Sequence, residues 1–282
     1  MTSSAVPHIT LHDGNTIPQL GFGSFKVDNT EAERIVSEAL QAGYRHIDTA
    51  AFYGNEEGVG RAIAASAIPR DELFITTKLW NDRHGDPDRA LAESLDRLGL
   101  DFVDLYLIHW PCPAQDRYLQ AWDYLQQAQQ DKLVRSIGVS NFLPEHLDRL
   151  LREADAAPVV DQIELHPAYQ RLDDVEFLRD HQIAVEAWGP LGQGKYALLD
   201  APEVTRAAEA HGKGPGQVII RWHLQHGRIL FPKSANPERI RQNIDVFDFE
   251  LTDEEMAAID GLDRGLDGRV GRDPNEMEPG TI

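Results

Sequence analysis

Apolar residues along this chain follow two patterns that alternate with each other. Short segments dense in apolar residues, such as 103–109, favour buried strands. Between them lie longer segments in which apolar residues recur with helical spacing, as Ile35, Ala39 and Leu40 do. Strict alternation of strand and helix over a chain of this length predicts a parallel (β/α)8 TIM barrel. An open doubly wound sheet is the alternative.

The predicted strands cover residues 19–23, 44–48, 73–78, 103–109, 134–140, 159–164, 184–188 and 229–232. Each is followed by predicted helix: from Thr30 to Gly43, through 59–63, from Pro87 to Gly99, at 118–129, 145–153 and 175–181, in segments over 202–225, and from Pro237. Thr30 and Glu33 have capping-box spacing at the first helix, and Thr252 and Glu255 have it at a last one. Residues 8–18 are typical of a hairpin that caps the barrel, and 261–282 of a long loop. One domain spanning 1–282 is expected.

Net charge and cysteine content exclude several classes of binding partner and of metal site. The 282 residues carry a formal net charge of -20, which argues against nucleic acid or an anionic membrane as a partner. Cys112 is the sole cysteine, so neither an internal disulfide nor a cysteine metal cluster can form, and a reducing cytoplasm fits. The first seven residues lack the features of a signal peptide, and no apolar run is long enough to cross a bilayer.

Ionisable residues collect where three successive strands end. Asp48, Lys78 and His109 close the second, third and fourth predicted strands, and Tyr53 follows Asp48 in the adjoining loop. A lysine at a buried strand end needs a partner, and Asp48 on the neighbouring strand can supply it. The ammonium should lower the pKa of the Tyr53 phenol and make it a better proton donor. His109 can donate a hydrogen bond to a developing oxyanion.

Such a set suits protonation of a carbonyl oxygen while a hydride reaches the carbon. The hydride must come from a nicotinamide or a flavin. Neither a Rossmann glycine fingerprint nor a Walker loop is present, so the cofactor is expected on the barrel rim. Asn141 and Gln162 match a carboxamide, and Trp188 offers a stacking face. Lys233 and Arg239 flank a helix start with Asn236 as its N-cap, which favours phosphate binding.

Several long motifs, in the same order along the chain, resemble the aldo-keto reductases. They are GYRHIDTA at 43–50, YGNE at 53–56, TKLW at 77–80, YLIHWP at 106–111, IGVSNF at 137–142, DQIELHP at 161–167 and FPKS at 231–234. Within that family, WGPLGQGK at 188–195 looks most like the bacterial 2,5-diketo-D-gluconic acid reductases. The resemblance implies a monomeric, NADPH-dependent reductase of aldehydes and ketones, keto-sugar acids among them.

The resemblance also implies residue roles. Tyr53 would be the general acid, assisted by Lys78 and Asp48, with His109 orienting the carbonyl. The implied cofactor-binding positions are Gly23, Ser140, Asn141, Gln162, Trp188, Gly189, Pro190, Leu191, Lys233, Ser234, Arg239, Gln242 and Asn243. Phe25, Trp80 and Trp110 would wall the substrate pocket. Arg269 and Arg272 in the C-terminal loop could reach an acidic substrate.

Two other functions remain as alternatives. A metal-dependent hydrolase in the same barrel could draw its ligands from His46, Asp48, His109 and His166. However, no His-x-His pair occurs in the first strand. A non-catalytic barrel that senses a nicotinamide cofactor should have lost a member of the acid, tyrosine, lysine and histidine set. This chain has all four.

Overall fold

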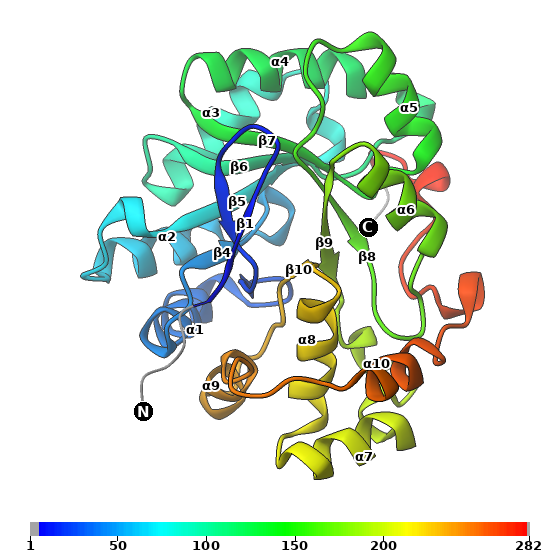
Figure 1. Cartoon of the computed structure of the whole chain (residues 1–282). Coiled ribbons are helices and arrows are strands. Elements are labelled where there is room, and N and C mark those ends of the chain that lie inside the picture. The colour runs from blue at the N-terminus through cyan, green and yellow to red at the C-terminus, as the bar shows by residue number, and fades with distance from the viewer. Residues whose placement is uncertain (1–5, 281–282) are drawn as a thin grey trace.

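Eight parallel strands form the centre of the molecule (Figure 1). The computed structural model describes residues 6–280, so most of the N-terminal stretch without signal-peptide features lies outside the described residues. Neighbouring strands pair in chain order, from β3 to β10. The sheet closes because Gly21 N donates to Leu230 O at 2.9 Å and Leu230 N donates to Gln19 O at 3.1 Å. The fold is therefore the predicted (β/α)8 barrel rather than an open sheet.

The strands are β3 (Phe22–Gly23), β4 (His46–Asp48), β5 (Phe74–Leu79), β6 (Val103–Ile108), β7 (Val134–Ser140), β8 (Val160–Glu164), β9 (Ala184–Trp188) and β10 (Ile229–Leu230). The first and last are shorter than predicted. A Cβ on Gly21 would lie 2.8 Å from the Phe231 ring, and one on Gly23 would lie 3.0 Å from Phe231 O. Glycine at these two positions allows the chain entering β3 to approach the chain leaving β10.

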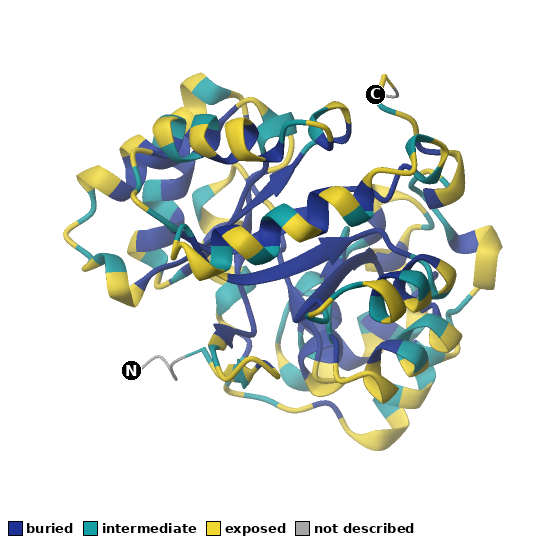
Figure 2. Cartoon of the chain, turned by 90° about the horizontal axis from the view of Figure 1, so that it is seen from above, coloured by how far each residue is buried: buried dark blue, intermediate teal, exposed yellow. Residues whose placement is uncertain are grey.

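Helices cover the outside of the barrel and turn their apolar faces inward (Figure 2). They are α1 (Asn29–Ala42), α2 (Glu56–Ala65), α3 (Pro87–Leu98), α4 (Tyr118–Gln130), α5 (Pro144–Glu153), α6 (Leu172–Asp180), α7 (Pro202–His211), α8 (Pro215–Gln225), α9 (Pro237–Ile244) and α10 (Asp253–Asp260). The predicted segment 202–225 divides into α7 and α8 because Gly212 ends the first with φ 63° and Pro215 begins the second.

The start of the first helix differs from the prediction. Asp28 is the N-cap of α1, and its carboxylate accepts from Thr30 N at 2.9 Å. Glu33 completes no capping box and instead pairs with Arg61 at 2.8 Å. Asp28, two residues before Thr30, offers a charged acceptor, which competes successfully for the free helix N–H groups. The predicted capping box of Thr252 and Glu255 at α10 is confirmed.

The N-terminal hairpin closes the amino end of the barrel. Strands β1 (His8–Thr10) and β2 (Thr16–Pro18) pair antiparallel, and Leu11 and Ile17 pack into a buried cluster that includes Phe74 and Val159. Those two residues lie at or just before the starts of β5 and β8. The hairpin therefore covers this end as predicted and leaves the carboxyl ends of the strands accessible.

Candidate active site

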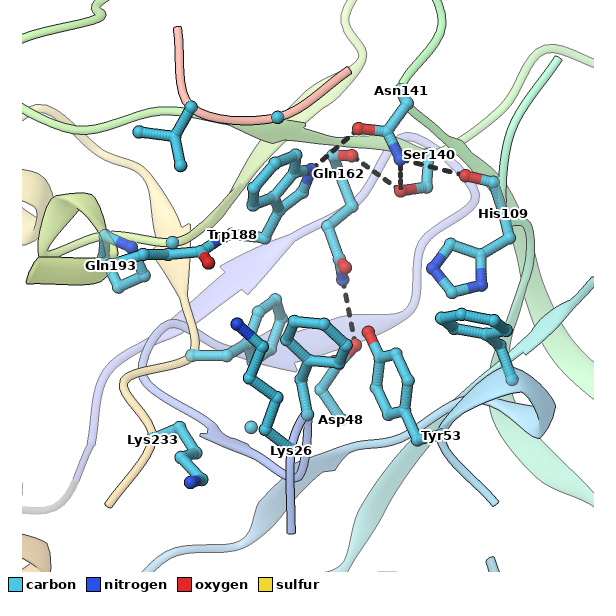
Figure 3. A pocket seen from close by; sticks show the side chains of 18 of the residues that line it. Lys26, Asp48, Tyr53, His109, Ser140, Asn141, Gln162, Trp188, Gln193 and Lys233 are labelled. Atoms are coloured by element: carbon cyan, nitrogen blue, oxygen red, sulfur yellow. Dashed lines mark hydrogen bonds between the residues drawn. The ribbon is translucent and has the colours of Figure 1, made fainter. Parts of the chain in front are cut away.

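A cavity of about 490 Å³ lies at the carboxyl ends of the strands (Figure 3). Most of the residues singled out from the sequence line it. They are Gly23, Phe25, Asp48, Tyr53, Trp80, His109, Trp110, Ser140, Asn141, Gln162, Trp188, Gly189, Pro190, Leu191 and Lys233. Parallel strands deliver their last residues to one rim, which is why residues far apart in sequence meet here.

A buried ion pair forms the floor beside this cavity. Lys78 is 0% exposed, and its Nζ donates to Asp48 Oδ1 at 2.8 Å and Oδ2 at 2.7 Å. A third bond goes to Thr49 O at 2.9 Å. Burial alone would lower the pKa of Lys78, but Asp48 above all, with Tyr53 and Glu186, raises it above the ordinary lysine value. Lys78 is therefore a charged ammonium, as the sequence argument required.

The Tyr53 hydroxyl lies at the edge of this pair. Lys78 Nζ is 3.4 Å from Tyr53 Oη and 5.1 Å from the centre of its ring. The predicted lowering of the Tyr53 pKa is wrong in its net direction. Burial raises the pKa to about 12, and the opposing effect of Lys78 does not overcome it. The sequence argument considered only the charge pair and omitted the cost of removing a phenolate from water.

His109 faces the same space as Tyr53. Their ring centres are 5.8 Å apart, and Trp80 packs edge-on against the imidazole at 5.0 Å. Burial, with a smaller contribution from Lys78, lowers the pKa of His109 well below its ordinary value. The imidazole is therefore neutral near pH 7, and it can donate a hydrogen bond through one N–H without carrying charge.

A buried amide connects the ion pair to a second carboxyl group. Gln162 Nε2 donates to Asp48 Oδ2 and to Glu186 Oε2, both at 2.9 Å (Figure 3 draws the bond to Asp48). Burial and then Asp48 raise the pKa of Glu186 to about 8, so this carboxyl is mostly protonated at neutral pH. Both amide protons of Gln162 are used in these bonds. The amide oxygen remains for a ligand in the cavity.

Trp188, Asn141 and Ser140 form a connected network on the opposite wall. Trp188 Nε1 donates to Asn141 Oδ1 at 2.7 Å, and Asn141 Nδ2 donates to Ser140 Oγ and His109 O, both at 3.0 Å. Ser140 Oγ donates to Gln162 O at 2.8 Å. The network fixes the plane of the indole. It also means that these groups already have partners in the protein, so a carboxamide would have to share them.

The predicted phosphate site is only partly at the cavity. Lys233 lines it, whereas Ser234, Arg239, Gln242 and Asn243 lie in the following turn and α9 and do not. Asn236 caps α9 as predicted, and its side chain accepts from Glu238 N at 2.8 Å and Arg239 N at 3.1 Å. These two backbone donors are therefore satisfied within the helix. Lys233 and Arg239 are both exposed.

Sequence reasoning missed part of the cavity wall. The additional lining residues are Lys26, Phe52, Gln193, Phe231, Pro232, Val270, Gly271 and Met277. Phe52 stacks on Trp80 with ring centres 3.8 Å apart, and its place beside Tyr53 in the strand-end motif was an available signal. Of the two loop arginines, Arg272 lines the cavity. Arg269 pairs with Asp273 at 2.8 Å and does not line it.

The four residues of the metal-hydrolase alternative do not converge. His46 has its two ring nitrogens 3.2 Å from Pro18 O and 3.0 Å from Thr76 Oγ1. His166 Nε2 lies 3.1 Å from Glu164 Oε1, and the Asp48 oxygens are bonded to Lys78. Within residues 6–280, no group of three or more His, Cys, Asp or Glu side chains is arranged to hold a metal ion. That alternative therefore lacks an assembled ligand set in the described chain.

Comparison with known proteins gives one consistent result. A family model described as the Aldo/keto reductase family matches residues 19–264. Methylglyoxal reductase DkgA of Yersinia pestis is 52% identical over 268 residues, covering 95% of this chain and 96% of that protein. The structure of an aldo/keto reductase from Brucella melitensis is 49% identical, with a TM-score of 0.90 over 93% of this chain and 100% of its own. A mutant of Gox0644 in complex with NADPH is 45% identical, with a TM-score of 0.93 over 98% and 100%.

Proposed function

The chain belongs to the aldo/keto reductase family and catalyses NADPH-dependent carbonyl reduction, and we propose that Tyr53 is the general acid of this reaction. The observation that carries the proposal is the position of the phenol, with its hydroxyl 3.4 Å from a fully buried ammonium and its ring 5.8 Å from the His109 ring. NADPH supplies the hydride when bound. The residues around the cavity control the proton and the carbonyl.

Proton transfer follows from the pKa pattern. A phenol whose pKa is about 12 keeps its proton at neutral pH, so Tyr53 is protonated when the carbonyl compound binds and can act as the acid. As the phenolate forms, the Lys78 ammonium stabilises the new negative charge, and Asp48 keeps that ammonium charged and in place. His109, neutral and rigidly packed, donates a hydrogen bond to the carbonyl oxygen and orients it beside the phenol.

The cavity wall fits a nicotinamide cofactor. Trp188 offers a fixed indole face, and the Gln162 oxygen is directed away from Asp48 and Glu186, where it can accept from a carboxamide N–H. We assign Ser140 and Asn141 to the same carboxamide, and Gly23 and Gly189–Leu191 to backbone contacts around the cofactor. Lys233, Ser234 and Arg239 would contact the 2′-phosphate side, with Gln242 and Asn243 near the adenine.

The substrate is a small carbonyl compound. Phe25, Trp80 and Trp110 give the cavity an apolar wall around a polar centre, which suits aldehydes and ketones. Because one relative is named a methylglyoxal reductase, methylglyoxal is the first compound to test, with 2,5-diketo-D-gluconate as an acidic candidate. Arg272 on the cavity wall would favour the acidic compound.

The organisation of the protein is a further part of the proposal. We assign residues 1–282 to one domain, supported by a buried core that runs from Leu20 to Ile259. A monomer is favoured because a single chain supplies the acid, the amine, the carboxylate and the imidazole of the site. Cytoplasmic location is supported by the free, buried thiol of Cys112. Among the described residues, no helix has the length and apolar character of a membrane span.

A substrate panel tests the function. Purified protein would be mixed with NADPH or NADH and with methylglyoxal, 2,5-diketo-D-gluconate or 4-nitrobenzaldehyde, with and without a chelator. The expected result is loss of the reduced-cofactor absorbance that depends on the carbonyl compound, is faster with NADPH and is unchanged by the chelator. Absence of oxidation with every compound would refute a reductase. Oxidation that is lost on chelation and restored by metal would instead mean that the reduction requires a metal ion.

A further inference from the structure

The segment after α10 forms part of the cavity wall without belonging to the barrel. It runs from residue 261 through two short 3-10 turns, Gly265–Gly268 and Pro274–Glu276. Between these turns, Val270, Gly271 and Arg272 line the cavity. Figure 3 shows this stretch as the faint red ribbon beside Trp188. A wall made of irregular chain needs specific bonds to keep its position, because it has no ladder of its own.

Those bonds come from Glu164, the last residue of β8. Glu164 is only 3% exposed. Oε1 accepts from Val270 N and Oε2 accepts from Gly271 N, both at 2.7 Å. Hydrogen bonds from neutral N–H groups to a carboxylate are short and strong, and here they engage two successive backbone donors with one rigid group. His166 Nε2 approaches the same carboxylate at 3.1 Å and holds it from the barrel side.

The loop is pressed against Trp188 as well as Glu164. A Cβ at Gly271 would lie 2.6 Å from Trp188 Cη2 and 2.8 Å from Glu164 Oε2. Only glycine allows the backbone to touch both groups at once. Trp188 is therefore held on one edge by its bond to Asn141 and on the other by this segment. The two bonds from Glu164 to Val270 N and Gly271 N are called the clamp below. The clamp thus affects both the substrate wall and Trp188, the proposed stacking partner of the nicotinamide.

Two other contacts of the segment do not hold the backbone of Val270 and Gly271 in place. Tyr196 Oη donates to Asp267 O at 3.0 Å and Arg269 O at 3.2 Å, which lie before the cavity-lining residues. The Arg269–Asp273 pair bridges two residues of the segment itself. Neither contact bonds the backbone of Val270 or Gly271. The backbone N–H groups of Val270 and Gly271 are both bonded to Glu164, at the end of β8.

We propose that Glu164 is a positioning residue of the reductase, which sets the outer wall of the substrate pocket by clamping Val270 and Gly271 against Trp188. The predicted effect on substrate binding rests on the proposed function, whereas the predicted effect on the loop does not. Glu164 touches neither the carbonyl nor Tyr53 and acts through the loop. Loss of the clamp should therefore loosen the wall and weaken binding of carbonyl compounds that reach it, with little change in the proton-transfer step.

The test uses two substitutions from opposite sides of the clamp. In Glu164→Gln one acceptor oxygen becomes an NH2 group that faces a backbone N–H, so one bond is lost. In Gly271→Ala the new methyl group pushes the loop off both partners. The matched control is Glu209→Gln, an exposed glutamate on α7. All proteins would be full length, and thermal midpoints would be recorded to identify general destabilisation.

Two readouts distinguish the outcomes. Amide hydrogen exchange of peptides covering 266–277 should accelerate at least tenfold in Glu164→Gln and Gly271→Ala, with β-strand peptides unchanged. KM for 4-nitrobenzaldehyde should rise about tenfold in both variants, the effect of losing one hydrogen bond to a charged group. In Glu164→Gln, which leaves Trp188 bonded to Asn141, kcat should change less than threefold. The double variant should resemble the worse single variant because both break one clamp.

The proposal is overturned if exchange in 266–277 stays at the wild-type rate, or if it rises equally throughout the protein. Additive effects of the two substitutions on KM would also overturn it. Because exchange requires no turnover, a failure of the reductase assignment would leave this readout intact. Conversely, normal reductase kinetics in the Glu164→Gln variant would refute the clamp proposal and leave the reductase assignment intact.

Discussion

Replacing Asp48 with asparagine should destabilise the fold as well as impair the chemistry. The substitution keeps the shape of the side chain but removes the charge that faces Lys78. The ammonium is 0% exposed and makes two of its bonds, at 2.8 and 2.7 Å, to the Asp48 oxygens. Breaking a buried pair by removing one partner leaves an uncompensated charge and costs about 3–5 kcal/mol. We expect a loss of free energy of unfolding in that range.

The same change should alter the protonation of Lys78. Burial alone lowers the pKa of this lysine, and the Asp48 carboxylate is the main effect that raises it. Without that carboxylate, the pKa should fall and the neutral amine should become accessible near neutral pH. A neutral amine no longer stabilises a phenolate at Tyr53, so reduction of methylglyoxal should fall together with stability.

A double-mutant cycle separates the pair from its surroundings. Asp48→Asn, Lys78→Met and the double variant would be unfolded in urea at pH 7 and followed by tryptophan fluorescence. Because the double variant removes both charges, its loss should be smaller than the sum of the single losses by roughly 2–3 kcal/mol. Additivity within about 0.5 kcal/mol would refute a strongly coupled buried pair and, with it, the argument that Asp48 keeps Lys78 charged.

Two further predictions concern the surroundings of the site. Burial and Asp48 raise the pKa of Glu186 from 4.5 to about 8, so the folded state retains a proton that the unfolded state loses. The stabilisation that comes from binding this proton is complete below pH 4.5 and is lost as the pH rises towards 8. Glu186→Gln should therefore gain stability relative to wild type between pH 5 and 8 in urea unfolding, and a pH-independent difference would contradict the burial argument. Arg239→Ala should weaken NADPH binding by roughly 1.5–3 kcal/mol and NADH binding far less, measured by fluorescence titration. Equal losses would mean that Arg239 does not contact the 2′-phosphate.

The barrel and its rim could be predicted because the relevant signals are local. Alternating strand and helix patterns determine the fold class, and parallel strands bring their final residues to one rim regardless of loop detail. Asp48, Lys78 and His109 each stand at a strand end, so their meeting followed from topology. The helix ends at Gly43 and Gly99 were equally visible, since both residues have positive φ, 109° and 64°.

What could not be predicted depends on burial and long-range packing. The pKa of Tyr53 rises because the phenol is removed from water, and no sequence pattern reports how completely that happens. Glu186 lies in an apolar strand, a signal of some special role, but its link to Asp48 through Gln162 requires the closed barrel. The clamp of Glu164 on Val270 joins positions 106 residues apart in a segment without periodicity.

Turnover of Tyr53→Phe is the most direct test of the central claim that a phenol beside a buried ammonium protonates the carbonyl. The substitution removes one oxygen and leaves the ring packed between Phe25 and His109. Single-turnover oxidation of bound NADPH by methylglyoxal should slow by about 10²–10⁴-fold, the usual contribution of a general acid. NADPH affinity, measured by fluorescence titration, should stay within about twofold. Near-normal turnover with intact NADPH binding would contradict the account.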